Sequence, residues 1–234
     1  VGNEGRELAG EERAPGGELK GWIAGRFGAD EPVALDAGAA HGLAHRLDRE
    51  TSGALLCARS YRGLLAARLA FAARAVRKEY LCLCHGLAAP APVLIEQPLR
   101  TVYKNGLRWR SVASVDGRHA CTEINMTAHF GHAAAGALSL VSLQLHTGRM
   151  HQVRAHLAAT GHSLVGDAVY GSTGGSWCPR LFLHASSLGV DLAGEPLVVR
   201  SPLPADLREA LEALAAANGR SRALLEEMAG RGTA

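Results

Sequence analysis

The chain has 234 residues, of which 47% are hydrophobic and 20% are charged. Such a size and composition are typical of a folded globular protein and exclude a disordered chain. The formal net charge of +3 permits a polyanionic partner without requiring one, so a surface for such a partner has to come from local clusters of cations.

In chain order, the first 18 residues are charged and Gly-rich, which predicts a flexible N-terminal arm ahead of one domain over 19–234. A short apolar stretch at 19–27 follows, then a loop with Gly, Asp and Pro. Apolar patterns predict strands at 53–58, 77–85, 95–103, 109–115, 119–128, 138–146, 181–190 and 196–199. Helices are predicted at 61–74, 149–160 and 204–217. Many strands with few helices between them indicate an α+β fold, with a mixed, mostly antiparallel sheet flanked by helices.

An acidic residue between two arginines stands out in the stretch HRLDRETSG at 45–53. The positive charges of Arg46 and Arg49 favour the ionised form of the Asp48 carboxyl group. An ionised carboxylate can act as a nucleophile or a base at neutral pH. For an isolated string of this kind, a surface Arg–Asp pair ahead of a Ser/Thr turn is the favoured alternative.

A second stretch, KEYLCLCHG at 78–86, lies on one of the predicted strands. Alternation places Lys78, Tyr80, Cys82 and Cys84 on one face. Tyr80 can stack on a base while the cation of Lys78 meets a phosphate. Taken alone, the stretch favours the alternative of a core tyrosine on a buried strand. The two cysteines have no second Cys or His pair at ligand-like spacing, so we expect no zinc site.

A third stretch, LHTGRMHQVRAH at 145–156, reaches into a predicted helix. Helical spacing places Arg149, Gln152 and His156 on a polar face near the helix start, where the helix dipole favours phosphate. The alternative for this face is ordinary solvent exposure. Arg154 borders the apolar face instead, and a guanidinium group there needs an acidic partner. Asp48 is the candidate partner.

A fourth stretch, GHSLVGDAVYG at 161–171, places three glycines and an acid around a short apolar run. Glycines at this density predict a tight turn that packs close to a site. Within it, Asp167 is expected to cap the turn or to hold an arginine, which is a structural role in either case.

Together, the four stretches resemble the RluA family of RNA pseudouridine synthases. The family strings are H-R-L-D-x-x-T-S-G at 45–53, K-x-Y with a downstream glycine at 78–86, T-G-R-x-H-Q-x-R-x-H at 147–156 and G-D-x-x-Y-G at 166–171. They occur in the family's order, and the resemblance covers about 41–217. Any one string can arise by accident, but four in order are a specific pattern.

The resemblance implies the pseudouridine synthase catalytic fold and the isomerisation of specific uridines to pseudouridine in ribosomal or transfer RNA. Asp48 would be the catalytic aspartate, Tyr80 would pack against the target uracil, and Arg154 would pair with the aspartate. Arg46 would fill the gap left by the flipped-out nucleotide. The further residues expected to contact RNA are Lys78, Arg149, Gln152 and His156. Neither a cofactor nor a metal is implied.

One stretch departs from the family pattern. Residues 19–44 contain nothing similar to the N-K-P-x-G-like strand that usually precedes the first string. This departure supports the alternative of a non-catalytic, synthase-like subunit that binds RNA or joins a larger assembly. A glycosidase is a weaker alternative, because it needs two facing carboxylates and only Asp48 lies in a reactive stretch.

The cysteine pattern and the lack of targeting signals bear on the compartment. The five cysteines are scattered along the chain, at Cys57, Cys82, Cys84, Cys121 and Cys178. Their spacing fits no disulfide framework, which favours a reducing compartment. No apolar run approaches the roughly 20 residues of a membrane helix, and no secretory signal opens the chain. We therefore expect a protein of the cytoplasm, mitochondrion or plastid that is neither secreted nor in a membrane.

Overall fold

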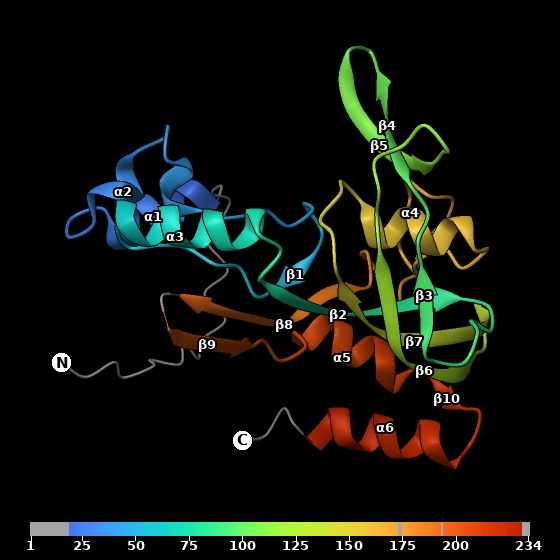
Figure 1. Cartoon of the computed structure of the whole chain (residues 1–234). Helices are drawn as coiled ribbons and strands as arrows, with labels where there is room; N and C mark the ends of the chain where they lie inside the picture. The colour runs from blue at the N-terminus through green and yellow to red at the C-terminus, as the bar shows by residue number, and fades with distance from the viewer. Residues whose placement is uncertain (1–18, 173–174, 193, 231–234) are drawn as a thin grey trace. The chain divides into compact units, whose positions relative to one another are not determined.

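The computed structural model describes residues 19–172, 175–192 and 194–230 (Figure 1). The predicted arm at 1–18 lies outside the described residues. Contacts divide the described chain into two compact units, one formed by residues 19–44 and 56–67 and the other by residues 45–55 and the chain from 68 onward. All four motif stretches lie in the second unit. No described helix is both long enough and apolar enough to cross a membrane.

The smaller unit is helical. Its elements are α1 (Leu19–Phe27), α2 (Pro32–Leu35), η1 (Ala40–Gly42) and the first part of α3 (Tyr61–Ala72). Its buried core contains Val33, Ala39 and Leu64. The loop expected after residue 27 therefore contains two short helical segments, and the first of these has a proline at its start, where the missing N–H needs no helical partner.

The larger unit is built on one eight-stranded sheet in the order β1-β8-β2-β7-β6-β10, with β3 paired to β6 and β9 paired to β8. Its strands are β1 (Ser52–Gly53), β2 (Arg77–His85), β3 (Val93–Ile95), β6 (Thr122–His132), β7 (Gly136–Leu145), β8 (Leu183–Leu192), β9 (Glu195–Arg200) and β10 (Ala215–Ala216). Its helices, besides the end of α3, are α4 (Gln152–Ala159), α5 (Ala205–Glu212) and α6 (Gly219–Gly230). Only the short β1–β8 pair is parallel among the described pairs of this sheet. The predicted α+β fold with a mostly antiparallel sheet is confirmed.

Both faces of this sheet are covered. Along β2, Tyr80 and Cys82 pack in a core that includes residues of α4. Leu81 and Leu83 point the other way and pack in a core that includes residues of α5. Figure 1 shows α4 and α5 on opposite sides of the sheet. Because both faces are covered, residues 80–84 are buried without a break.

A separate two-stranded sheet of β4 (Leu99–Lys104) and β5 (Leu107–Ala113) forms a hairpin that projects from the main sheet (Figure 1). Its turn residues, Asn105 and Gly106, have φ angles of 52° and 75°. A two-residue type I′ turn needs positive φ at both positions, and Asn-Gly is the favoured sequence for it. The strands predicted at 95–103 and 109–115 are therefore mostly the two arms of one hairpin.

The strand predicted at 53–58 is wrong over most of its length. The strand β1 ends at Gly53, and further along only Cys57 forms an isolated bridge, to Leu43. Gly53 has a φ of +117°, and a Cβ atom added to it would lie 2.2 Å from the carbonyl oxygen of Ala185 on β8. The chain approaches β8 so closely here that only glycine fits, and it turns away immediately afterwards.

Gly53→Ala is expected to lower the free energy of unfolding by at least about 2 kcal/mol, because it adds both a clash with Ala185 and a strained φ. Gly161→Ala is the matched control, since its φ is +85° but nothing lies within 4 Å of an added Cβ atom. The control should lose only about 1 kcal/mol. Urea unfolding measures both variants, and equal losses would mean that a small shift relieves the contact with Ala185.

Two predicted helices differ from the structure at their ends. The helix expected at 149–160 begins at Gln152, because His151 adopts a left-handed conformation with φ of 51°. The helix expected at 204–217 ends at Glu212, where β10 follows and pairs with β6. The last described helix, α6, was not predicted.

Candidate active site

The loop that carries Asp48 is fastened from the C-terminal part of the chain. Arg180 donates from Nη1 to the carbonyl oxygen of Glu50 at 3.0 Å and from Nη2 to the hydroxyl of Ser52 at 3.3 Å. The same guanidinium group is paired with the carboxylate of Asp206 on α5, with 3.0 Å between Nη2 and Oδ1. Arg180 therefore connects the loop that carries Asp48, at Glu50 and Ser52, to helix α5.

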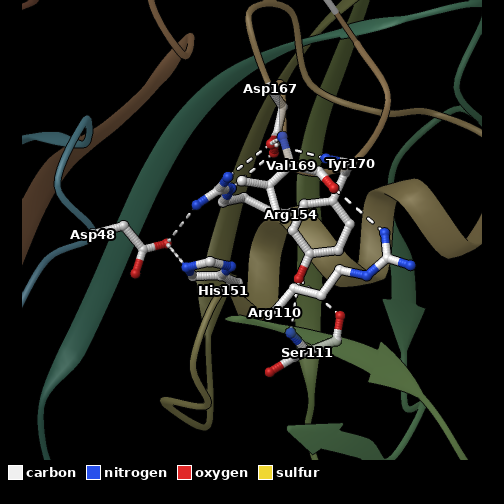
Figure 2. Close-up of polar contacts among 8 residues, drawn as sticks. All are labelled: Asp48, Arg110, Ser111, His151, Arg154, Asp167, Val169 and Tyr170. Atoms are coloured by element: carbon white, nitrogen blue, oxygen red, sulfur yellow. Dashed lines mark hydrogen bonds and ion pairs between the residues drawn. The ribbon is translucent and has the colours of Figure 1, made fainter. Parts of the chain in front are cut away.

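Arg154 extends from α4 toward this loop. Its Nη1 lies 3.5 Å from Oδ2 of Asp48, so the structure brings the predicted pair together. Its closer partner is Asp167, which accepts hydrogen bonds from Nε and Nη2, each at 2.7 Å (Figure 2). Arg154 is 5% exposed and Asp167 is fully buried. The two-point pair with Asp167 orients the guanidinium group and leaves Nη1 directed at Asp48.

His151 also reaches Asp48 and is a residue that the sequence did not single out. Its Nε2 lies 3.9 Å from Oδ2 of Asp48. Burial lowers the pKa of this imidazole, although the nearby charge of Asp48 acts in the opposite direction. Its Nδ1 is buried and has no hydrogen-bond partner among the described residues. A neutral imidazole and a guanidinium group thus face the same carboxylate oxygen.

A cavity of about 340 Å³ lies beside this carboxylate. Asp48, Tyr80, His151 and Arg154 all line it. Burial and the charge of Asp48 raise the pKa of Tyr80 to about 12, so the phenol stays neutral at physiological pH. The volume is within the range of sites that hold a small ligand or a single nucleobase. The Asp48 carboxylate, whose Oδ2 faces both Arg154 and His151, therefore lines a pocket that has the ring of Tyr80 in its wall.

Tyr170 links the hairpin to this site. Its hydroxyl donates to the carbonyl oxygen of Ser111 on β5 at 2.7 Å, and the backbone N–H of Ser111 donates to the same hydroxyl at 3.0 Å (Figure 2). The guanidinium carbon of Arg154 lies 5.4 Å from the centre of the Tyr170 ring. Asp167 accepts from the backbone N–H of Tyr170 at 3.2 Å. Tyr170 belongs to the motif stretch at 166–171, but the sequence pattern alone did not assign it a role in the site.

Three of the residues predicted to contact RNA are at the rim of the cavity. Arg46 is exposed, and Lys78 and Arg149 are half-buried; all three line the cavity. Burial lowers the pKa of Lys78, whose Nζ donates to the backbone carbonyl of Thr147 at 3.4 Å. The Nε of Arg149 donates to the carbonyl oxygen of His119 at 2.9 Å.

The exposed position predicted for Gln152 and His156 is wrong. Gln152 is 3% exposed, and His156 is fully buried. The amide nitrogen of Gln152 donates to the carbonyl oxygen of Cys121 and to the hydroxyl of Thr122. His156 bonds to the same hydroxyl of Thr122 and to the carbonyl oxygen of Gln97, each at 2.9 Å. Helix α4 packs this face against β6, so both side chains form hydrogen bonds within the fold, and Gln152 also lines the cavity.

Protonation of buried histidines should destabilise the fold in acid. Burial lowers the pKa of His45 from 6.5 to about 4, and burial also lowers the pKa of His156 and His184. The unfolded chain then binds protons more tightly than the folded chain, so the stabilising contribution is complete above pH 6.5 and is lost as the pH falls toward about 4. Thermal melting from pH 7 to pH 4 should show a falling midpoint, and His45→Gln should reduce the slope. A midpoint that is constant over this range would contradict the prediction.

The described residues contain no cluster of three His, Cys, Asp or Glu side chains placed to hold a metal ion. The cysteines Cys82 and Cys84 are both fully buried and belong to the core that faces α4. Burial raises the pKa of Cys84 to about 12, so this thiol stays protonated at physiological pH. Both cysteines therefore contribute to the packing of this core.

Comparison with known proteins identifies a family for this chain. Residues 26–159 match the family described as RNA pseudouridylate synthase. The chain is 36% identical over 184 residues to an uncharacterized RNA pseudouridine synthase of Mycobacterium bovis, which covers 74% of this chain and 56% of that protein. It is 34% identical over 181 residues to ribosomal large subunit pseudouridine synthase C of Yersinia pestis, which covers 74% of this chain and 55% of that protein. The chain thus spans a little over half the length of these curated relatives.

A solved structure supports the same comparison. The structure of human RNA pseudouridylate synthase domain containing 1 superposes with a TM-score of 0.65 at 28% sequence identity. The superposition covers 80% of this chain and 79% of that one. The similarity therefore extends over most of the architecture and beyond the four motif stretches.

Proposed function

The chain belongs to the RNA pseudouridylate synthase family, and we propose that it isomerises specific uridines to pseudouridine in ribosomal or transfer RNA. The observation that carries this proposal is the Asp48 carboxylate, held by Arg154 at 3.5 Å and facing a cavity walled by Tyr80. The name of the Yersinia pestis relative supports ribosomal RNA as the substrate.

In the proposed reaction the target uridine leaves the base stack and enters this cavity, because its glycosidic bond is inaccessible within a helix. The uracil detaches from the ribose, turns, and is joined again through its carbon 5. Asp48 is the reacting group, Arg154 pairs with it and orients it, and the ring of Tyr80 packs against the uracil. Arg46, exposed at the rim, fills the space that the nucleotide vacates.

The hairpin adds a second contact surface for RNA. Trp109 on β5 is exposed, and the guanidinium carbon of Arg110 lies 4.4 Å from the centre of its ring. The Nζ of Lys104 lies 5.4 Å from the same ring. Aromatic rings with cations beside them bind unstacked bases and the phosphates between them. The hairpin is tied to the site through Tyr170, so RNA that contacts Trp109 is held close to the cavity.

Mapping pseudouridines in RNA from cells with and without this protein tests the proposal. We expect one or a few positions to lose their pseudouridine when the protein is absent, and to regain it when the wild-type chain is restored. Restoration by Asp48→Ala as well as by the wild type would favour the alternative, in which a synthase-like subunit supports RNA assembly without catalysis. No change at any position would contradict the proposed activity.

A further inference from the structure

A second cavity, of about 350 Å³, adjoins the candidate active site. The two cavities share four lining residues, Phe71, Lys78, Gly148 and Arg149. The second cavity extends past them to Arg74 and His146. A polymer that places one unit in the first cavity would therefore bring its next unit to the second.

The second cavity is lined by three cations, two arginines and a lysine, for which the described part of the chain supplies no acidic partner. Arg74, Lys78 and Arg149 line it, and none of its described lining residues is an acid. No described carboxylate lies within ion-pair distance of these three cations, and the side chains of Lys78 and Arg149 donate to backbone carbonyl groups. His146 differs, because it pairs with Glu123 at 2.8 Å. Arg74 is exposed, whereas Lys78 and Arg149 are half-buried. Three cations that line one cavity without a carboxylate beside them attract an anion from outside the chain.

The backbone at Arg74 supports a role for its side chain. Arg74 lies two residues after the end of helix α3, in the left-handed conformation with φ of 59°. The helix closes there through a hydrogen bond from the N–H of Ala75 to the carbonyl oxygen of Ala70 at 2.9 Å. Glycine is the usual residue at such a helix end, because a Cβ atom is unfavourable in this conformation. The backbone conformation therefore does not account for an arginine at this position, whereas its side chain lines the cavity.

We propose that the second cavity binds the phosphodiester of the nucleotide next to the flipped-out uridine. The inference rests on the proposed function, since it takes the occupant of the first cavity to be that uridine. Guanidinium groups bind phosphate oxygens through two parallel hydrogen bonds, and Lys78 adds a point charge at the wall between the cavities. A phosphate held here fixes the backbone on one side of the target while the base is in the cavity.

The test measures binding of a labelled ten-uridine oligoribonucleotide by fluorescence anisotropy between about 50 and 200 mM potassium chloride. All variants are made in the Asp48→Ala background, so that isomerisation plays no part. Arg74→Gly should weaken binding by about 3- to 10-fold and reduce the salt slope by about 0.7, the value for one lost phosphate contact on a single strand. Because glycine suits the left-handed position, the same variant should melt at an unchanged or higher temperature.

Arg200→Ala is the matched control, since it removes an equal charge from an exposed position on β9. Equal effects of Arg74→Gly and Arg200→Ala, or no effect of Arg74→Gly, would overturn the proposal. So would a failure of the parent protein to bind the probe, or its displacement by millimolar inorganic phosphate at fixed ionic strength, which would indicate a site for free phosphate. A selective effect of Arg74→Gly supports the phosphodiester site even where uridine mapping refutes the isomerase activity.

Discussion

Asp48→Ala is expected to lower the rate of pseudouridine formation by roughly 10³-fold or more, because it removes the group proposed to react with the nucleotide. The affinity for RNA should be nearly unchanged, since the contacts to phosphates and bases come from other residues. Release of tritium from carbon 5 of labelled uridines measures the rate, because that hydrogen leaves when the new bond forms. Filter binding measures the affinity on the same preparations.

Two further variants separate chemistry from folding. Asp48→Asn keeps the size of the side chain and removes the charge, and it should be as inactive as Asp48→Ala. Glu50→Ala is the matched control, because its side chain is an exposed carboxylate in the same loop and the contact with Arg180 uses its backbone. The control should retain activity. Loss of the thermal transition in Asp48→Asn would instead mean that the acid is structural.

Asp167→Ala is expected to lower the free energy of unfolding by about 3–5 kcal/mol, because it leaves the guanidinium group of Arg154 buried without its main partner. The same carboxylate accepts from the backbone N–H groups of Val169 and Tyr170, so the turn loses its cap as well. Activity should fall too, because Arg154 is then free to move away from Asp48. Urea unfolding followed by circular dichroism gives the stability change.

A double variant identifies the source of this loss. Arg154→Met combined with Asp167→Leu removes both charges and replaces them with apolar side chains, which is often close to neutral for stability. It should recover a substantial part of the stability that Asp167→Ala loses, yet remain inactive. A loss below about 1 kcal/mol in Asp167→Ala would show that water or a shifted neighbour compensates the arginine.

The sequence was most informative where local pattern and tertiary packing agree. The strand predicted at 77–85 matches β2 at both ends, because its apolar run is buried on both faces of the sheet. The motif strings placed Asp48, Tyr80 and Arg154 together, and the three line one cavity. In these cases the polarity and charge of the side chains already restrict the environments in which they can be stable.

Prediction failed where a neighbouring element decides the environment. Helical spacing placed Gln152 and His156 on a polar face. It could not reveal that β6 packs against that face and that the hydroxyl of Thr122 forms hydrogen bonds with both side chains. The contact of His151 with Asp48 depends on one left-handed residue ahead of α4, which no periodicity reports. Asp167 was predicted either to cap a turn or to pair with an arginine, and in the structure it does both.

The ion pair between Arg180 and Asp206 makes helix α5 part of the structure that positions the Asp48 loop. Removal of α5 and α6, or proteolysis between β9 and α5, would separate Asp206 from Arg180. Arg180 would then keep only its hydrogen bonds to the Asp48 loop. Activity would then decline through loosening of the loop, with every group that touches the nucleotide still present. A shortened version of this protein should therefore retain α5, because this helix stabilises the loop that carries the reacting carboxylate.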